Sequence, residues 1–110
     1  MATLTVIHWR AIPAQVNARE GREAAKAMLG QRFQVAVDRA ARIAGRKEMD
    51  AYLAEWRRVE RPCGPDLAAE VAAEVERLEA EYTRERLADL VAAGGAEAFV
   101  AEVEAVRDRG

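Results

Sequence analysis

The sequence is poor in the residues from which many reactive sites are built. Its 110 residues include one cysteine, Cys63, and one histidine, His8. A lone cysteine excludes an internal disulfide, and without Cys/Cys or Cys/His spacing we expect no metal site and no cofactor. No stretch approaches the ~20 apolar residues that cross a bilayer, and the N-terminus lacks a signal-peptide pattern. We therefore expect a cytoplasmic protein without membrane contacts.

Catalytic motifs are scarce as well. His8 has no serine or cysteine around it in a recognisable nucleophile motif, and only Arg58 and Arg61 lie near Cys63 to activate its thiol. Gly94-Gly95 precedes a helical pattern but follows no strand, so it does not form a phosphate loop. We name no catalytic residue, and the sequence favours a binding role over an enzymatic one.

Charge is unevenly distributed along the chain, although the net charge is only −2. Residues 1–63 contain 12 Lys/Arg and 7 Asp/Glu, a balance of +5, whereas residues 64–110 contain 5 and 12, a balance of −7. The length predicts one domain over residues 1–110, with a basic α/β part (1–63) and an acidic helical part (64–110). These parts could complement each other within one molecule or between two, so a homodimer is an open alternative.

β-Branched and aromatic residues dominate the first segment. Residues 3–9 read TLTVIHW and alternate in a way that predicts a strand with apolar side chains on both faces. Pro13 cannot donate to a central ladder and disfavours helix at Ile12, so the chain should turn around residues 10–13 before an extended run resumes. The segment therefore predicts a β-hairpin.

Apolar residues recur at three and four residues from Gly21 to Ile43, the spacing of one helix face. We predict a single long helix over residues 21–44, in which Gly30 costs up to about 1 kcal/mol relative to alanine, with two shorter helices as the alternative. Gly45 is a suitable C-terminal cap.

Residues 50–61 fit either a helix or a strand. We favour a strand, because a third strand beneath the long helix would give the two tryptophans a shared core. Residues 61–65 (RPCGP) break the pattern, and Asp66 can cap a helix that continues to about residue 91, with a kink near Thr83. A last helix is expected over residues 96–108.

The expected fold class is therefore α+β. A short antiparallel sheet of two or three strands packs against a long helix and is followed by a C-terminal helical hairpin. The basic residues could in principle track a phosphate backbone, since Arg19, Arg22 and Lys26 share one expected helix face with Arg39, Arg42 and Arg46. A solvated face with nearby acidic partners is the simpler interpretation, so we do not expect nucleic acid as a partner.

Two tryptophans stand next to arginines, in Trp9-Arg10 and in Trp56-Arg57-Arg58. An aromatic ring beside a guanidinium offers a flat surface for stacking and for carboxylates. The alternative is that both rings belong to the core. We interpret Pro13 as bending the strand into a rigid edge on which Arg10 and Gln15 reach the surface while Trp9 anchors the bend. The candidate partner-binding residues are Trp9, Arg10, Pro13, Gln15, Trp56 and Arg57.

A family resemblance rests on two segments and on the Ala-rich stretch between them. The segments are Ile7-His8-Trp9-Arg10-Ala11-Ile12-Pro13-Ala14-Gln15-Val16 and Asp50-Ala51-Tyr52-Leu53-Ala54-Glu55-Trp56-Arg57. The chain resembles, over about residues 3–91, the small bacterial family called virulence factor. A similar domain is attached to the HEAT-repeat proteins called conserved virulence factor C. The family name describes a phenotype and implies no catalytic residue.

Stand-alone members are associated with gene neighbourhoods of folate- and corrinoid-dependent methyl transfer, so the resemblance also implies an accessory role in one-carbon metabolism. Our leading hypothesis is a non-enzymatic accessory protein that docks another protein through the Trp/Arg edge. The alternatives are a small subunit or enzyme in folate- or corrinoid-dependent methyl transfer and, third, a nucleic-acid-binding module.

Overall fold

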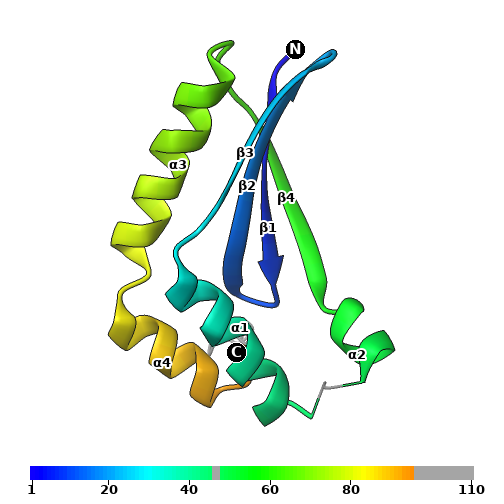
Figure 1. The fold of residues 1–110 in the computed structure, drawn as a ribbon, viewed down its shortest axis with the longest axis vertical. Helices are drawn as coiled ribbons and strands as arrows, with labels where there is room; N and C mark the ends of the chain where they lie inside the picture. Colours follow the sequence, from blue (N-terminus) through cyan, green and yellow to red (C-terminus); the bar gives the residue numbers. More distant parts are fainter. Residues whose placement is uncertain (46–47, 96–110) are drawn as a thin grey trace, which may run out of the picture.

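The computed structural model describes residues 1–45 and 48–95. They form an α+β fold around one antiparallel four-stranded sheet in the order β3-β2-β1-β4 (Figure 1). The strands are β1 (Thr3–Trp9), β2 (Ile12–Glu20), β3 (Glu23–Met28) and β4 (Trp56–Pro62). The helices are α1 (Gln31–Ile43), α2 (Met49–Leu53), α3 (Leu67–Glu81) and α4 (Arg84–Ala92). The expectation of two or three strands was therefore too low.

The β1–β2 hairpin is present where the sequence predicts it. Arg10 occupies the turn with φ +54°, a left-handed conformation that is uncommon for a residue other than glycine. The register shifts between Ile7 and His8, and this bulge places Pro13 opposite His8. Pro13 is buried. The proline therefore fixes the irregular end of the hairpin without breaking the sheet.

The single long helix over residues 21–44 is wrong. Gly21 (φ +62°) turns the chain, and residues 23–28 pair with β2 as strand β3. The sequence EAAKAM favours helix locally, but pairing with β2 half-buries Ala25 and Ala27 and overrides that preference. The helix begins only at Gln31, after Gly30. The alternative of two shorter helices is wrong as well, since the first half is a strand.

The region 50–61 contains both structures that its pattern allowed. Residues Met49–Leu53 form the short helix α2, and only residues from Trp56 onward form a strand. The shared core of the two tryptophans is confirmed, because Trp9 and Trp56 are paired across β1 and β4 and each ring contacts Tyr52.

The acidic part begins as the sequence predicts. The Asp66 side chain accepts a hydrogen bond from Ala69 N–H and caps α3. At the expected kink the helix ends, and Thr83 caps the new helix α4 by accepting from Arg86 N–H. The helix expected over residues 96–108 lies outside the described residues. No helix in the described ranges is long and apolar enough to span a bilayer.

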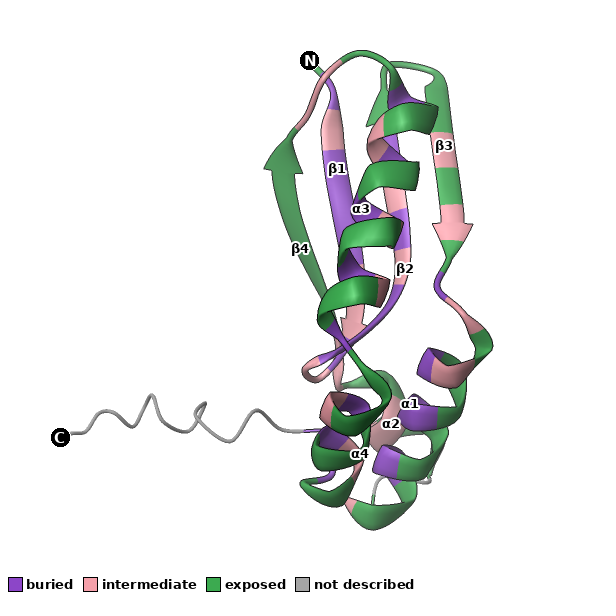
Figure 2. Cartoon of the chain, turned by 90° about the vertical axis from the view of Figure 1, so that its left-hand side faces the viewer, coloured by how far each residue is buried: buried purple, intermediate pink, exposed green. Residues whose placement is uncertain are grey.

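Helix α3 lies across one face of the sheet, where it packs on β2 and β3 (Figure 2). Helices α1 and α4 pack against each other beyond one end of the strands (Figure 1). One core joins these layers, and its largest fully buried side chains are Trp9, Phe33, Leu4, Ile12, Val16, Val37 and Pro13. Strand β4 forms the edge of the sheet farthest from β3 and is exposed to solvent along nearly its whole length (Figure 2).

Polar contacts join the start of α1 to the end of α3. Gly30 N–H donates to Glu79 Oε2 (2.8 Å), which satisfies a main-chain donor at the start of α1. Arg32 donates to the carbonyl oxygens of Glu79 (2.7 Å) and Tyr82 (3.0 Å), which lie at the end of α3. Each helix therefore supplies a cap for the other.

Candidate functional site

Strand β4 is an edge strand of the sheet, and two hydrogen bonds just beyond its ends show how its main chain is oriented. Arg10 N–H donates to the Glu55 carbonyl (3.0 Å), and Cys63 N–H donates to the Ala2 carbonyl (3.1 Å). Both pairs continue the regular β1–β4 register. Hydrogen-bonded and non-hydrogen-bonded pairs alternate along an antiparallel ladder. The odd-numbered residues of β4 are therefore the ones bonded to β1.

The even-numbered residues consequently direct their main-chain groups away from the sheet. Trp56, Arg58 and Glu60 present N–H and C=O groups on the outer side, where none of the described strands pairs with β4. Pro62 fits this pattern, because its missing N–H would also face outward and costs the ladder nothing. We call this row of outward main-chain groups the β4 edge.

A groove runs between β4 and α3, with a volume of about 310 Å³. Its apolar lining is contributed by Leu4, Val6, Val59, Leu78 and Tyr82, and its polar lining by His8, Arg61, Glu74, Arg77 and Glu81. Val59 is 57% exposed although it is apolar and lies in the middle of the strand. The groove therefore offers an apolar floor with charged walls directly beside the β4 edge.

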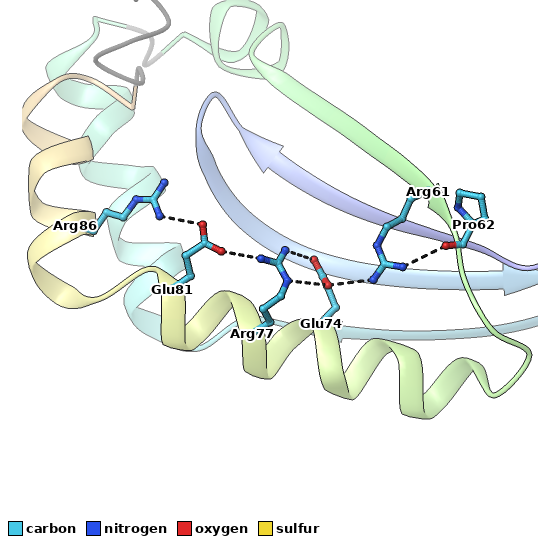
Figure 3. Close-up of polar contacts among 6 residues, drawn as sticks. All are labelled: Arg61, Pro62, Glu74, Arg77, Glu81 and Arg86. Atoms are coloured by element: carbon cyan, nitrogen blue, oxygen red, sulfur yellow. Dashed lines mark hydrogen bonds and ion pairs between the residues drawn. The ribbon is translucent and has the colours of Figure 1, made fainter.

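The charged wall of the groove is one continuous network (Figure 3). Arg61 Nη2 lies 3.2 Å from Glu74 Oε1, and Arg77 Nη2 lies 2.6 Å from Glu74 Oε2. Arg77 continues to Glu81 (2.7 Å), and Arg86 binds the other oxygen of Glu81 (3.1 Å). The network fixes the side chains that connect β4 to α3.

Glu74 is the centre of this network, because it is only 6% exposed while Arg61 and Arg77 are about half exposed. The hydrogen bond from Arg77, helped by Arg61, lowers the pKa of the Glu74 carboxyl below its ordinary value of 4.5, although burial opposes the shift. Glu74 raises the pKa of Arg77 in return. The carboxylate is therefore held ionised between its two arginines.

Replacing Glu74 with glutamine should destabilise the protein at neutral pH and much less in acid. The folded-state pKa is depressed, so the stabilisation is fully present above pH 4.5 and is lost as the pH falls through the folded value. We expect Glu74→Gln to lower the free energy of unfolding by about 1–2 kcal/mol near neutrality. Urea unfolding of both proteins across the acid range measures this difference. A constant difference at every pH would contradict the charged role of Glu74.

His8 lies in the same groove. Burial lowers the pKa of its imidazole, a hydrogen bond with the Val6 main chain opposes the shift, and Arg57 lowers the pKa further. Nδ1 is buried and has no hydrogen-bond partner within the described ranges. The lowered pKa favours the neutral imidazole, and His8 places a buried polar atom in the groove that Val59 also lines.

No helix of residues 1–45 and 48–95 covers the opposite face of the sheet, which forms a shallow hollow of about 870 Å³. Polar and charged side chains line it, namely Thr3, Thr5, Gln15, Asn17, Arg19, Lys26, Arg58 and Glu60. Gln15 Nε2 donates to Asn17 Oδ1 (2.8 Å), which orders the middle of this face. The basic residues of the expected helix face are separated: Arg19 and Lys26 line this hollow, Arg39 lies on α1, and Arg46 lies outside the described residues.

The structure divides the six candidate residues into two groups. Trp9 and Pro13 are fully buried, and Trp9 Nε1 donates to the Tyr52 carbonyl (2.9 Å). Arg10 was expected at the surface, but its side chain is only 19% exposed and binds Glu55 (3.2 Å) and the Gly94 carbonyl (3.0 Å). Its guanidinium stacks over the Trp9 ring at 5.4 Å inside the protein. These three residues hold the fold together.

The other three candidates reach the surface. Gln15 lies on the uncovered face, Trp56 is half-buried against Tyr52, and Arg57 is exposed opposite His8. The sequence interpretation missed Val59, Glu60 and Glu74. An apolar residue between charged ones in WRRVERP was a usable signal for an edge strand. Nothing in the spacing of Glu74 and Arg77 distinguished a buried pair from an ordinary surface pair.

The fold and the site define a small α+β protein whose antiparallel sheet ends in an open, charged edge strand beside a groove. A family model described as virulence factor matches residues 7–91. The match covers most of the chain, and the protein belongs to the virulence factor family. Comparison with curated proteins and with solved structures gives no significant match. In the part of the chain that the structure describes, no cluster of three His, Cys, Asp or Glu side chains could hold a metal ion.

Proposed function

We propose that this member of the virulence factor family is a non-enzymatic protein-binding module whose docking surface is the β4 edge with the adjoining groove. The observation that carries the proposal is the outward orientation of the main-chain groups of Trp56, Arg58 and Glu60 beside the exposed Val59. An extended segment of another protein chain can add to such an edge as a strand, and main-chain hydrogen bonds then provide affinity.

The groove supports the proposal by supplying selectivity. Alternate side chains of an added strand would face the α3 side, where Val59 offers apolar contact and Arg61 and Glu74 offer fixed charges.

Changing Glu60 to proline should abolish partner binding, whereas changing it to alanine should weaken binding much less. Proline removes the outward N–H without breaking the β1–β4 ladder, and alanine keeps that N–H. We expect affinity purification of the tagged protein from its native host to recover at least about tenfold less partner with Glu60→Pro than with Glu60→Ala. Circular dichroism confirms that both variants are folded. Equal recovery with the two variants would refute docking at the β4 edge.

A further inference from the structure

We propose that the strand accepted by β4 is β4 of a second copy of this chain, so that two sheets join into one continuous sheet around a two-fold axis. This inference rests on the proposed function in one respect, since both use the β4 edge. A two-fold interface requires a self-complementary surface, in which each residue meets the same counterpart in both directions. The sequence of β4 satisfies this requirement in one register.

That register places Val59 opposite Val59 of the second copy. Arg58 then lies opposite Glu60 of the second copy, and Glu60 opposite its Arg58, so that two ion pairs form across the interface. These are the residues whose main-chain groups point outward, so they also exchange the new main-chain hydrogen bonds. Among the described residues, neither Arg58 nor Glu60 has an ion-pair partner within its own chain.

Neighbouring registers are worse. If the two-fold axis passes through residue 58 in place of Val59, Arg58 lies opposite Arg58 of the second copy. If the axis passes through residue 60, Glu60 lies opposite Glu60. Like charges directly opposite each other destabilise a strand pair. Only the Val59 register also places every residue of β4 opposite a β4 residue of the second copy. At each end Trp56 meets Pro62, which has no N–H to donate, so the end pairs form one main-chain hydrogen bond fewer. Charge and length therefore favour the same alignment.

The remaining side chains of β4 fit the α3 side of this interface. Val59, which is 57% exposed in the single chain, becomes buried against its equivalent. Arg57 lies opposite Arg61 of the second copy, but Arg61 is already paired with the buried carboxylate of Glu74 at 3.2 Å. Because Arg77 shares the same carboxylate, Glu74 offsets only part of the Arg61 charge. The contact with Arg57 is therefore a cost, which the two Arg58–Glu60 pairs and the burial of Val59 must exceed.

The other edge of the sheet, β3, lacks these properties. Helix α3 packs on β3 and covers its inner side. Lys26 is the only charged side chain in the middle of that strand, so a second β3 would bring lysine near lysine or alanine without an acidic partner. The self-complementary edge is therefore β4.

Charge exchange at the two positions tests the register directly. We expect Arg58→Glu and Glu60→Arg each to weaken dimerisation by at least about tenfold, because each brings like charges together at both symmetric sites. An equimolar mixture of the two variants restores opposite charges at both sites, and so does the double variant R58E/E60R. Analytical ultracentrifugation of the full chain over a wide concentration range measures all four samples beside the unchanged protein.

The expected result is a concentration-dependent dimer in the unchanged chain, the mixture and the double variant, and monomers in the single variants. An interface made of one strand pair buries little surface and is weak, so the protein concentrations used in ultracentrifugation must extend to high values. A chain that stays monomeric throughout overturns the inference, as does a dimer that both single variants leave intact. If the chain is monomeric while Glu60→Pro still abolishes capture of another protein, the inference fails and the proposed function stands.

Discussion

Replacing Trp9 with alanine should lower the free energy of unfolding by about 3–5 kcal/mol, the largest effect that we expect from any single substitution. Trp9 is 0% exposed, its ring stacks on Tyr52 with centroids 5.8 Å apart, and its Nε1 donates to the Tyr52 carbonyl. Gly95 lies so close that a Cβ there would be 3.0 Å from the ring. The cavity left by alanine would therefore be enclosed on several sides.

Urea unfolding followed by far-ultraviolet circular dichroism measures this loss independently of tryptophan fluorescence. Trp56→Ala is the matched control, because Trp56 is only half-buried and meets Tyr52 edge-on. We expect it to cost about 1–2 kcal/mol. A Trp56→Ala loss as large as that of Trp9→Ala would mean that the core is not centred on Trp9.

Arg10→Ala should destabilise the fold by about 2–3 kcal/mol, because Arg10 joins three distant segments. Its side chain binds Glu55 ahead of β4 and the Gly94 carbonyl after α4, while its own main chain forms the β1–β2 turn. Removing the guanidinium withdraws a charged partner from a mostly buried carboxylate.

Two comparisons isolate this role in thermal or urea unfolding. Arg57→Ala, at an exposed position, should change stability by less than about 0.5 kcal/mol. Arg10→Gly should be at least as stable as Arg10→Ala, since glycine accepts the left-handed φ of +54° without strain. If Arg10→Ala were as stable as the unchanged protein while partner capture was lost, Arg10 would belong to the docking surface after all.

The parts of the fold that follow from local chemistry could be predicted from the sequence. Strand 3–9, the turn around residues 10–13 and the Asp66 cap all express strong local preferences. At Thr83 the sequence predicted only a kink, where the structure has a helix end and a new cap. Strand β3 could not be predicted, because EAAKAM prefers helix when taken alone and becomes a strand only when β2 lies beside it.

The candidate site was predicted only in outline. Adjacent tryptophan and arginine residues do mark important positions, but spacing alone could not show that Arg10 turns inward while Arg57 turns outward. The β4 edge depends on which main-chain groups face β1. That orientation is a property of the register between two strands almost 50 positions apart in the chain, as in the pairing of Trp9 with Trp56.

The reciprocal caps between α1 and α3 constrain the order in which the chain folds during synthesis. Gly30 and Arg32 bind to Glu79 and Tyr82. The hydrogen bonds at the start of α1 therefore cannot all form until Tyr82 has emerged from the ribosome. Strand β4 emerges earlier than these caps and carries Arg58 and Glu60 on the polar face of the sheet, next to its outward main-chain groups. Charges on an edge strand disfavour pairing with strands of other sequence, so Arg58 and Glu60 restrict the β4 edge to partners of complementary charge while the rest of the chain is still being made.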